Sequence, residues 1–335
     1  MMDDFQQDIE RYELKSNIKN TAGKAAKMLF ILGAMTQILS IGTVFIIKFL
    51  ESGFIGNLTS GLTISKDMYN YLAGYLPCII ADIIVIIIGI KITKIKIKSD
   101  MFCKNESELK FISLGAISCI GVGIVSGVIY TLYSTLLSIM GISIPAPDFS
   151  MPTGNPFMLA LFLGYVCILG PILEEIIFRG FILKSMQRFG NLTAIIVTSI
   201  LFSMFHLNLV QFVPPILIGL VLGFITVKSK SLIPSIIAHI FNNTVAFGMS
   251  AIVTLDSSIQ TIFLLLYSAG SLLGLIFFII EYSGEFKTLM KEETRIYSTY
   301  KKVLLSFSGK WSIVYIIFYA VMIIGMFILT NLSGL

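Results

Sequence analysis

The sequence predicts an all-α fold, a polytopic transmembrane helical bundle of about nine spans with the N-terminus cytoplasmic and the C-terminus outside. Apolar residues of the AVILMFWYC set make up 56% of the 335 residues, and charged residues make up only 13%. The mean hydropathy is +0.91, which the core of a water-soluble domain of this length does not require. The lengths of the apolar segments and the placement of the basic residues lead to the same conclusion.

Nine apolar segments are long enough to cross a bilayer as helices, because one crossing takes about 20 predominantly apolar residues. Each boundary is set only by where the apolar pattern fades. The expected spans are 27–49, 70–91, 110–142, 157–186, 191–207, 209–227, 231–253, 257–280 and 311–331.

The basic residues mark one side of the predicted membrane. Of the 24 Lys and Arg residues, all but Lys48 and Lys66 flank alternate ends of the nine segments. Basic loops stay in the cytoplasm, which puts the N-terminus inside and the C-terminus outside. The net charge of +5 is spread over short loops, so it indicates topology, and no nucleic-acid partner is expected.

The N-terminal segment and the cysteines indicate no signal peptide, disulfide framework or metal site. The first 26 residues are polar and of mixed charge, so no cleavable signal peptide is expected. Three of the four cysteines lie within predicted spans, and none has the spacing of a metal site. We therefore expect no disulfide framework and no cofactor.

Glu174, His206 and His239 stand inside apolar segments, and the two histidines are the only ones of the chain. Ionisable groups are rare at such positions because removing them from water is costly. Each is therefore a candidate for function, and the segment around each one decides what it could do.

Two adjacent acids, Glu174 and Glu175, lie in the inner half of the fourth predicted span. Glu175 precedes Arg179 by four residues, the favourable order for an ion pair within one helix. Glu174 points about 100° away from that pair. We expect Glu175 to be neutralised and structural, and Glu174 to be able to act as a general base or acid. The alternative is that both acids merely end a span at the lipid headgroups.

The two histidines follow on later spans. Counted from the 188–191 turn, Glu174 and His206 lie about 21 and 22 Å deep at 1.5 Å per residue, so we expect them to meet. Alone, His206 would be taken for a hydrogen-bonded structural residue.

His239 and Asn243 are four residues apart and share a helix face, so they offer two hydrogen-bond donors to one point, as an oxyanion site does. Counted from Ser231, His239 is only about 12 Å deep, so its helix must tilt, start earlier or enter the site from below. A structural pair bonded to a neighbouring helix is the alternative.

Taken together, the motifs EExxxR at 174–179, FxxxH at 202–206 and HxxxN at 239–243 resemble the CPBP family. These are intramembrane glutamic endopeptidases related to the CAAX prenyl endopeptidase, and the resemblance covers about residues 157–250. It implies that Glu174 is the catalytic base, that His206 helps it activate water, and that His239 and Asn243 stabilise the oxyanion. The remaining motif positions are filled by Glu175 and Arg179.

Two other readings remain open. Glu174, His206 and His239 could serve as the three protein ligands of a zinc site with water in the fourth position. The same groups could also bind a ligand without proteolysis, in a transporter or a bacteriocin-immunity protein. Asp82, midway along the second span, favours transport because it is an intramembrane acid outside the motifs. A packing role for Asp82 is the alternative.

The expected partners are a peptide or membrane-associated protein substrate and the lipid bilayer. Relatives are associated with prenylated CAAX peptides in eukaryotes and archaea and with secreted peptides in bacteria. The many Ile, Lys and Asn residues indicate an AT-rich bacterial genome, and hence the plasma membrane.

The stretch 282–310 suits either a helix on the inner membrane face or a solvated connector. The expected regions are a cytoplasmic segment 1–26, three helices in 27–142, a catalytic core 157–253, and two helices in 257–335 that enclose the cytoplasmic loop 282–310.

Overall fold

The computed structural model is all-α over the part of the chain that it describes. The described residues are 2–52, 64–104, 107–145, 151–152, 154–249, 252, 257–291 and 296–333. The last residues of the predicted span 231–253 lie partly outside them.

Six helices of the described residues are long and apolar enough to cross a membrane. Each overlaps one of the predicted spans, and all but the helix over 110–142 contain theirs in full. They are α1 (Met2–Glu51), α2 with η2 and α3 (Lys66–Asn70, Tyr71–Tyr75 and Leu76–Thr93), α4 (Leu109–Ile139), the segment from α5 to η6 (Pro156–Phe189), α11 (Ser257–Met290) and α13 (Lys310–Ser333).

The other three predicted spans are helices, but short ones. They are α8 (Asn191–Phe205), α9 (Val213–Ser229) and α10 (Ile233–Gly248), of 15, 17 and 16 residues. At 1.5 Å per residue they measure about 22 to 26 Å, less than the roughly 30 Å of a hydrocarbon core. The chain is thus a multi-pass helical membrane protein, and nine full crossings stay a prediction.

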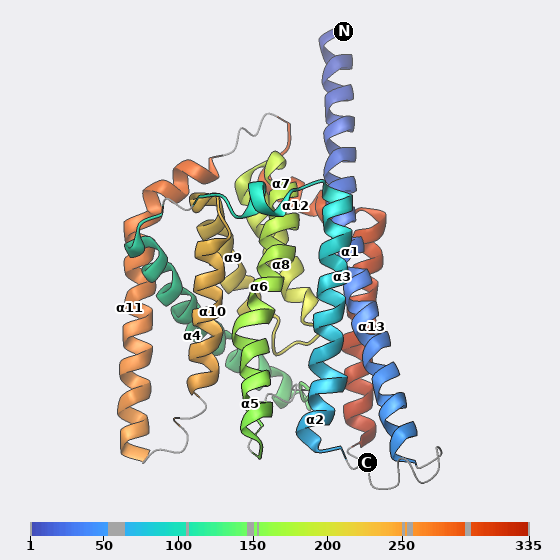
Figure 1. Cartoon of the computed structure of the whole chain (residues 1–335). Helices are drawn as coiled ribbons and strands as arrows, with labels where there is room; N and C mark the ends of the chain where they lie inside the picture. The colour runs from blue at the N-terminus through green and yellow to red at the C-terminus, as the bar shows by residue number, and fades with distance from the viewer. Residues whose placement is uncertain are drawn as a thin grey trace.

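The three short helices and the α5–η6 segment form the centre of the bundle (Figure 1). On one side α4 packs against α9, α10 and α11, and on the other side α1 packs against α3 and α13. The α4–α11 contact is close because of glycine, since a Cβ added to Gly121 would collide with the backbone of Ser271. Small residues at such crossings let helix backbones approach each other in membranes.

One end of the bundle carries the basic segments. The short helix α7 (Lys184–Met186) and α12 (Thr299–Phe307) lie at the upper end of the bundle in Figure 1, the start of α1 projects beyond that end, and α13 runs to the opposite end. We call this the basic end. In the stretch 282–310, α11 continues to Met290, and α12 packs against α1 and α8. The buried Lys302 of α12 donates a hydrogen bond from Nζ to the carbonyl oxygen of Phe189, at 2.8 Å.

Candidate functional site

The two glutamates stand at the end of a short α-helix between two π-helical stretches. α6 (Gly170–Glu175) follows η4 (Gly164–Leu169) and precedes η5 (Ile176–Leu183). Pro171 at the start of α6 has no N–H to donate, so it cannot continue the regular hydrogen-bond ladder. π-helical turns are rare and are frequent at functional sites.

The Glu175 side of α6 is closed. Glu175 and Arg179 are both fully buried, and Glu175 Oε1 lies 2.8 Å from Arg179 Nη1 and 3.0 Å from His239 Nδ1. The expected ion pair is therefore present. A carboxylate oxygen only accepts hydrogen bonds, so His239 donates from Nδ1. The helical segment continues beyond Glu175 to Phe189, so the two acids do not end it.

The Glu174 side is more open. The Glu174 side chain is 18% exposed, and its nearest basic partner is His239, with 3.7 Å between Oε2 and Nε2. That distance is too long for a hydrogen bond. His239 thus lies between the two acids, hydrogen-bonded to Glu175 and facing Glu174 with its second nitrogen.

His239 reaches the glutamates because α10 starts deep in the bundle. The N–H of Leu232 donates to the carbonyl oxygen of Met101 at 2.9 Å, and Met101 packs so closely on Gly180 that a Cβ there would collide with it. Leu232 is therefore level with Gly180. Glu174 lies six residues before Gly180, and His239 lies seven residues after Leu232. The two side chains therefore lie at about the same depth.

His206 forms no direct ion pair with the glutamates among the described residues. It caps the end of α8, and its Nδ1 donates to the carbonyl oxygen of Phe202 at 2.9 Å. No ion pair within 4.0 Å joins it to Glu174 or Glu175 among the described contacts. The expected meeting of Glu174 and His206 across a water therefore stays a prediction, because a depth count fixes the level of a side chain but not the direction in which it points. Because Nδ1 carries the proton of this bond, Nε2 keeps its lone pair in the neutral ring.

Phe202 connects the separate parts of the site. The guanidinium carbon of Arg179 lies 4.5 Å from the centroid of the Phe202 ring. The rings of His206 and His239 lie 5.1 and 5.9 Å from the same centroid. Nε and Nη2 of Arg179 have no hydrogen-bond partner, so the aromatic face compensates part of its charge. The FxxxH pattern contains Phe202, but nothing in the sequence indicates this role.

The turn after α8 is fixed by a residue that sequence reasoning missed. Leu207 has a φ of 53°, a left-handed conformation that costs energy for a branched side chain. Asn208 holds this turn by donating from Nδ2 to the carbonyl oxygen of His206 and to Gln211 Oε1, both at 2.8 Å. Asparagine next to a helix end is the only signal that could have found it.

Asn243 lies one turn beyond His239 on α10, but its amide already has partners. Nδ2 donates to the carbonyl oxygen of Val166 in η4 at 2.9 Å, and Oδ1 accepts from Asn242 at 3.2 Å. One of its two amide hydrogens is left to donate. In this structure His239 and Asn243 hydrogen-bond to different protein groups, and their convergence on an oxyanion stays a prediction.

Asp82 of α3 faces the site from outside the motifs. α3 and the α5–η6 segment run in the same direction (Figure 1). The rings of Tyr75 and Tyr165 are 5.4 Å apart. Seven residues after Tyr75, Asp82 reaches the level of Glu174 and interacts with it electrostatically. Asp82 is 2% exposed, and its Oδ1 has no hydrogen-bond partner.

The described residues contain no group of three or more His, Cys, Asp or Glu side chains placed to hold a metal ion. The zinc reading requires Glu174, His206 and His239 to converge, and in this structure only Glu174 and His239 approach each other.

The comparisons with known proteins fall on the same segment. Residues 156–245 match the family model described as Rce1-like, type II CAAX prenyl endopeptidase Rce1-like. No curated protein and no solved structure matches the chain. The matched segment runs from α5 into α10 and contains all six motif residues singled out from the sequence. The resemblance to the CPBP family is thus confirmed over residues 156–245, the part of this membrane protein that matches the Rce1-like, CAAX protease-like model.

Proposed function

We propose that the chain is an intramembrane glutamic endopeptidase that hydrolyses a peptide bond with water activated by Glu174 and His206. The observation that carries the proposal is the division of labour between the two acids. Glu175 is fully buried and tied to Arg179 and His239, whereas Glu174 is 18% exposed and has no hydrogen bond to either. One carboxylate holds the site together and the other is free to exchange a proton.

The proposed attack uses the two groups that keep free lone pairs. Glu174 takes a proton from a water, and the oxygen of that water attacks the peptide carbonyl. His206 orients the water with Nε2, which is available because Nδ1 donates to the carbonyl oxygen of Phe202. Glu174 then passes its proton to the leaving amine. Water reaches the site through the opening that leaves Glu174 partly exposed.

The developing oxyanion is stabilised by donors on α10. His239 carries on Nδ1 the proton that it donates to Glu175. Its Nε2 takes up a second proton from the solvent that reaches the open side of the site, and both ring nitrogens are then donors. Nε2 then donates to the oxyanion, helped by the remaining amide hydrogen of Asn243. One such donor contributes about 3 to 4 kcal/mol to the rate in soluble proteases.

A cleavage assay tests the proposal. The full-length protein is reconstituted in liposomes and mixed with a prenylated CAAX peptide or with apolar unmodified peptides, and the products are identified by mass spectrometry. We expect cleavage by the wild type and none by Glu174→Gln. A protein that binds a peptide but cleaves none would instead support the transport or immunity reading.

We also propose nine crossings with the N-terminus in the cytoplasm. The basic end holds the start of α1, and α13 finishes at the opposite end (Figure 1), which supports an odd number of crossings. A reporter fused after Leu335 is expected to report an outside location. A cytoplasmic signal would mean that one span does not cross, and the first candidate is 209–227, which contains Pro214 and Pro215.

A further inference from the structure

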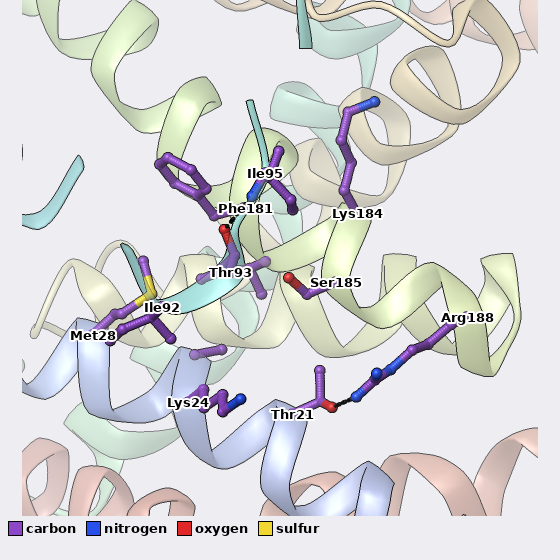
Figure 2. A pocket seen from close by; sticks show the side chains of 12 residues that line it. Thr21, Lys24, Met28, Ile92, Thr93, Ile95, Phe181, Lys184, Ser185 and Arg188 are labelled. Atoms are coloured by element: carbon purple, nitrogen blue, oxygen red, sulfur yellow. Dashed lines mark hydrogen bonds between the residues drawn. The ribbon is translucent and has the colours of Figure 1, made fainter. Parts of the chain in front are cut away.

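A pocket of about 230 Å³ opens at the basic end, where α1 meets the end of α3 and the helix that continues from η5 into α7 (Figure 2). It lies outside the site described above. Its walls come from three separate helical segments, so it is a feature of the tertiary fold rather than of one loop.

The pocket is polar at its mouth and apolar along its wall. Lys24 of α1 and Arg188 reach the pocket from facing elements, next to the hydroxyls of Thr21 and Ser185 (Figure 2). Arg188 donates from Nη2 to Thr21 Oγ1. The rest of the wall is formed by apolar side chains, among them Met28, Ile92 and Phe181.

Two of the three cations that line the pocket, Lys24 and Arg188, lack an acidic partner among the described residues. No Asp or Glu lines it, and among the described residues no ion pair joins Lys24 or Arg188 to a carboxylate. Lys184 is partly compensated, because Asp100 interacts with it electrostatically. Uncompensated cations on two facing walls create a concentrated positive potential.

A second pocket of about 700 Å³ adjoins the first and shares Thr21, Lys24 and Arg188 with it. Lys19, Lys27 and Lys310 line this second pocket, and it too contains no acidic residue. Lys24 and Arg188 therefore stand between two basic hollows on the side that the basic loops assign to the cytoplasm.

We propose that the first pocket binds the phosphate headgroup of an anionic phospholipid. Lys24 and Arg188 contact the phosphate oxygens, for which the planar guanidinium is well shaped. The apolar wall of Met28, Ile92 and Phe181 receives the start of an acyl chain, which free phosphate does not possess. Basic pockets between transmembrane helices on the cytoplasmic side bind lipid headgroups in this way.

The test measures binding and does not depend on the proposed peptidase activity. Full-length protein in a neutral detergent is titrated with phosphatidylglycerol, phosphatidylcholine, glycerol 1-phosphate or inorganic phosphate, and bound lipid is counted by native mass spectrometry. We expect phosphatidylglycerol to bind in preference to phosphatidylcholine. Saturating phosphatidylglycerol should also raise Tm by about 3 °C or more, because it binds only the folded state.

Three variants locate the site. Lys24→Gln and Arg188→Gln should each weaken phosphatidylglycerol binding by about tenfold, the loss expected for one hydrogen bond to a charged group. The control is Lys98→Gln, which removes the same charge from an exposed lysine that lines neither pocket and should bind like wild type. If Arg188→Gln fails to fold, Arg188→Lys keeps the charge and should bind less tightly than wild type because the bidentate contact is lost.

Equal binding of phosphatidylcholine and phosphatidylglycerol would overturn the proposal. So would an unchanged affinity in both Lys24→Gln and Arg188→Gln, or a loss as large in Lys98→Gln. Binding of inorganic phosphate or glycerol 1-phosphate as tight as that of the lipid would assign the pocket to a water-soluble phosphate and refute the lipid assignment.

Discussion

The two glutamates of α6 have the same side chain but lie in different environments. On one side Glu175 is completely buried and shares its carboxylate between Arg179 and His239. On the other side Glu174, one residue earlier, keeps 18% of its side chain exposed and faces His239 at 3.7 Å. A rotation of about 100° per residue is all that separates the two environments.

The difference shows how one helix supplies both support and chemistry. A buried carboxylate with a buried guanidinium is stable only as a pair, because removing one partner leaves an unpaired charge in the interior. An acid with partial access to water and no hydrogen-bonded cation can take up and release a proton at little cost to the fold. The comparison predicts that substitutions on the two sides fail in different ways.

The largest effect is expected on the open side. Glu174→Gln should lower kcat/KM by about 10³-fold, because it removes the general base. Tm should stay close to the wild-type value, since the nearest basic group is 3.7 Å away and no hydrogen bond is lost to it. Cleavage kinetics and thermal unfolding of the same preparation check both halves. A fall in Tm as large as that of Glu175→Gln would remove the distinction between the two sides.

On the closed side, Glu175→Gln should lower both the stability of the fold and the peptidase activity. Glu175→Gln leaves Arg179 as a buried unpaired charge, at a cost of about 3 to 5 kcal/mol in the free energy of unfolding. Thermal unfolding and protein yield measure the loss.

The double variant Glu175→Gln with Arg179→Met is the matched control. It removes both charges and should recover part of the stability but not the activity, because His239 has also lost its acidic partner. A double variant no more stable than Glu175→Gln would show that the unpaired guanidinium is not the cause.

Much of the fold and of the glutamate pair could be predicted from local sequence patterns. All nine predicted spans overlap helices, since apolar runs of that length leave a chain few alternatives in a membrane. The Glu175–Arg179 pair follows from a spacing of four residues on one helix, which fixes the geometry before any packing is known. The motifs that match the Rce1-like model lie within residues 156–245.

What could not be predicted depends on contacts between distant residues. The depth of His239 is set by Leu232 bonding to Met101, a residue far away in the chain that packs on Gly180. The orientation of His206 is set by its bond to Phe202 and by the left-handed Leu207. A count along one helix contains no information on either contact, so it could not predict that His239 is the histidine in direct contact with Glu175.

A smaller effect is expected at Asp82, which adds a second acid to the open side. Asp82→Asn should leave the fold intact, because Oδ1 has no hydrogen-bond partner to lose. Peptide cleavage should change by less than about tenfold, since charge removal acts on Glu174 only through space. Cleavage kinetics decide the point. A loss comparable to that of Glu174→Gln would place Asp82 in the reaction or in a transport path.

The smallest effect is expected from metal removal, which tests whether the residues around Glu174 cleave a peptide without a metal ion. Glu174, His206, His239 and Asn243 supply a base and oxyanion donors, so we expect the reaction to need no Lewis acid. Purified active protein should contain zinc far below one per chain, and slow treatment with a membrane-permeant chelator should leave cleavage unchanged. The matched control is a known zinc protease treated in the same liposomes, which must lose its activity. If stoichiometric zinc leaves together with activity and restores it on return, the open side is a metal site, and Glu174 and His239 are ligands rather than base and donor.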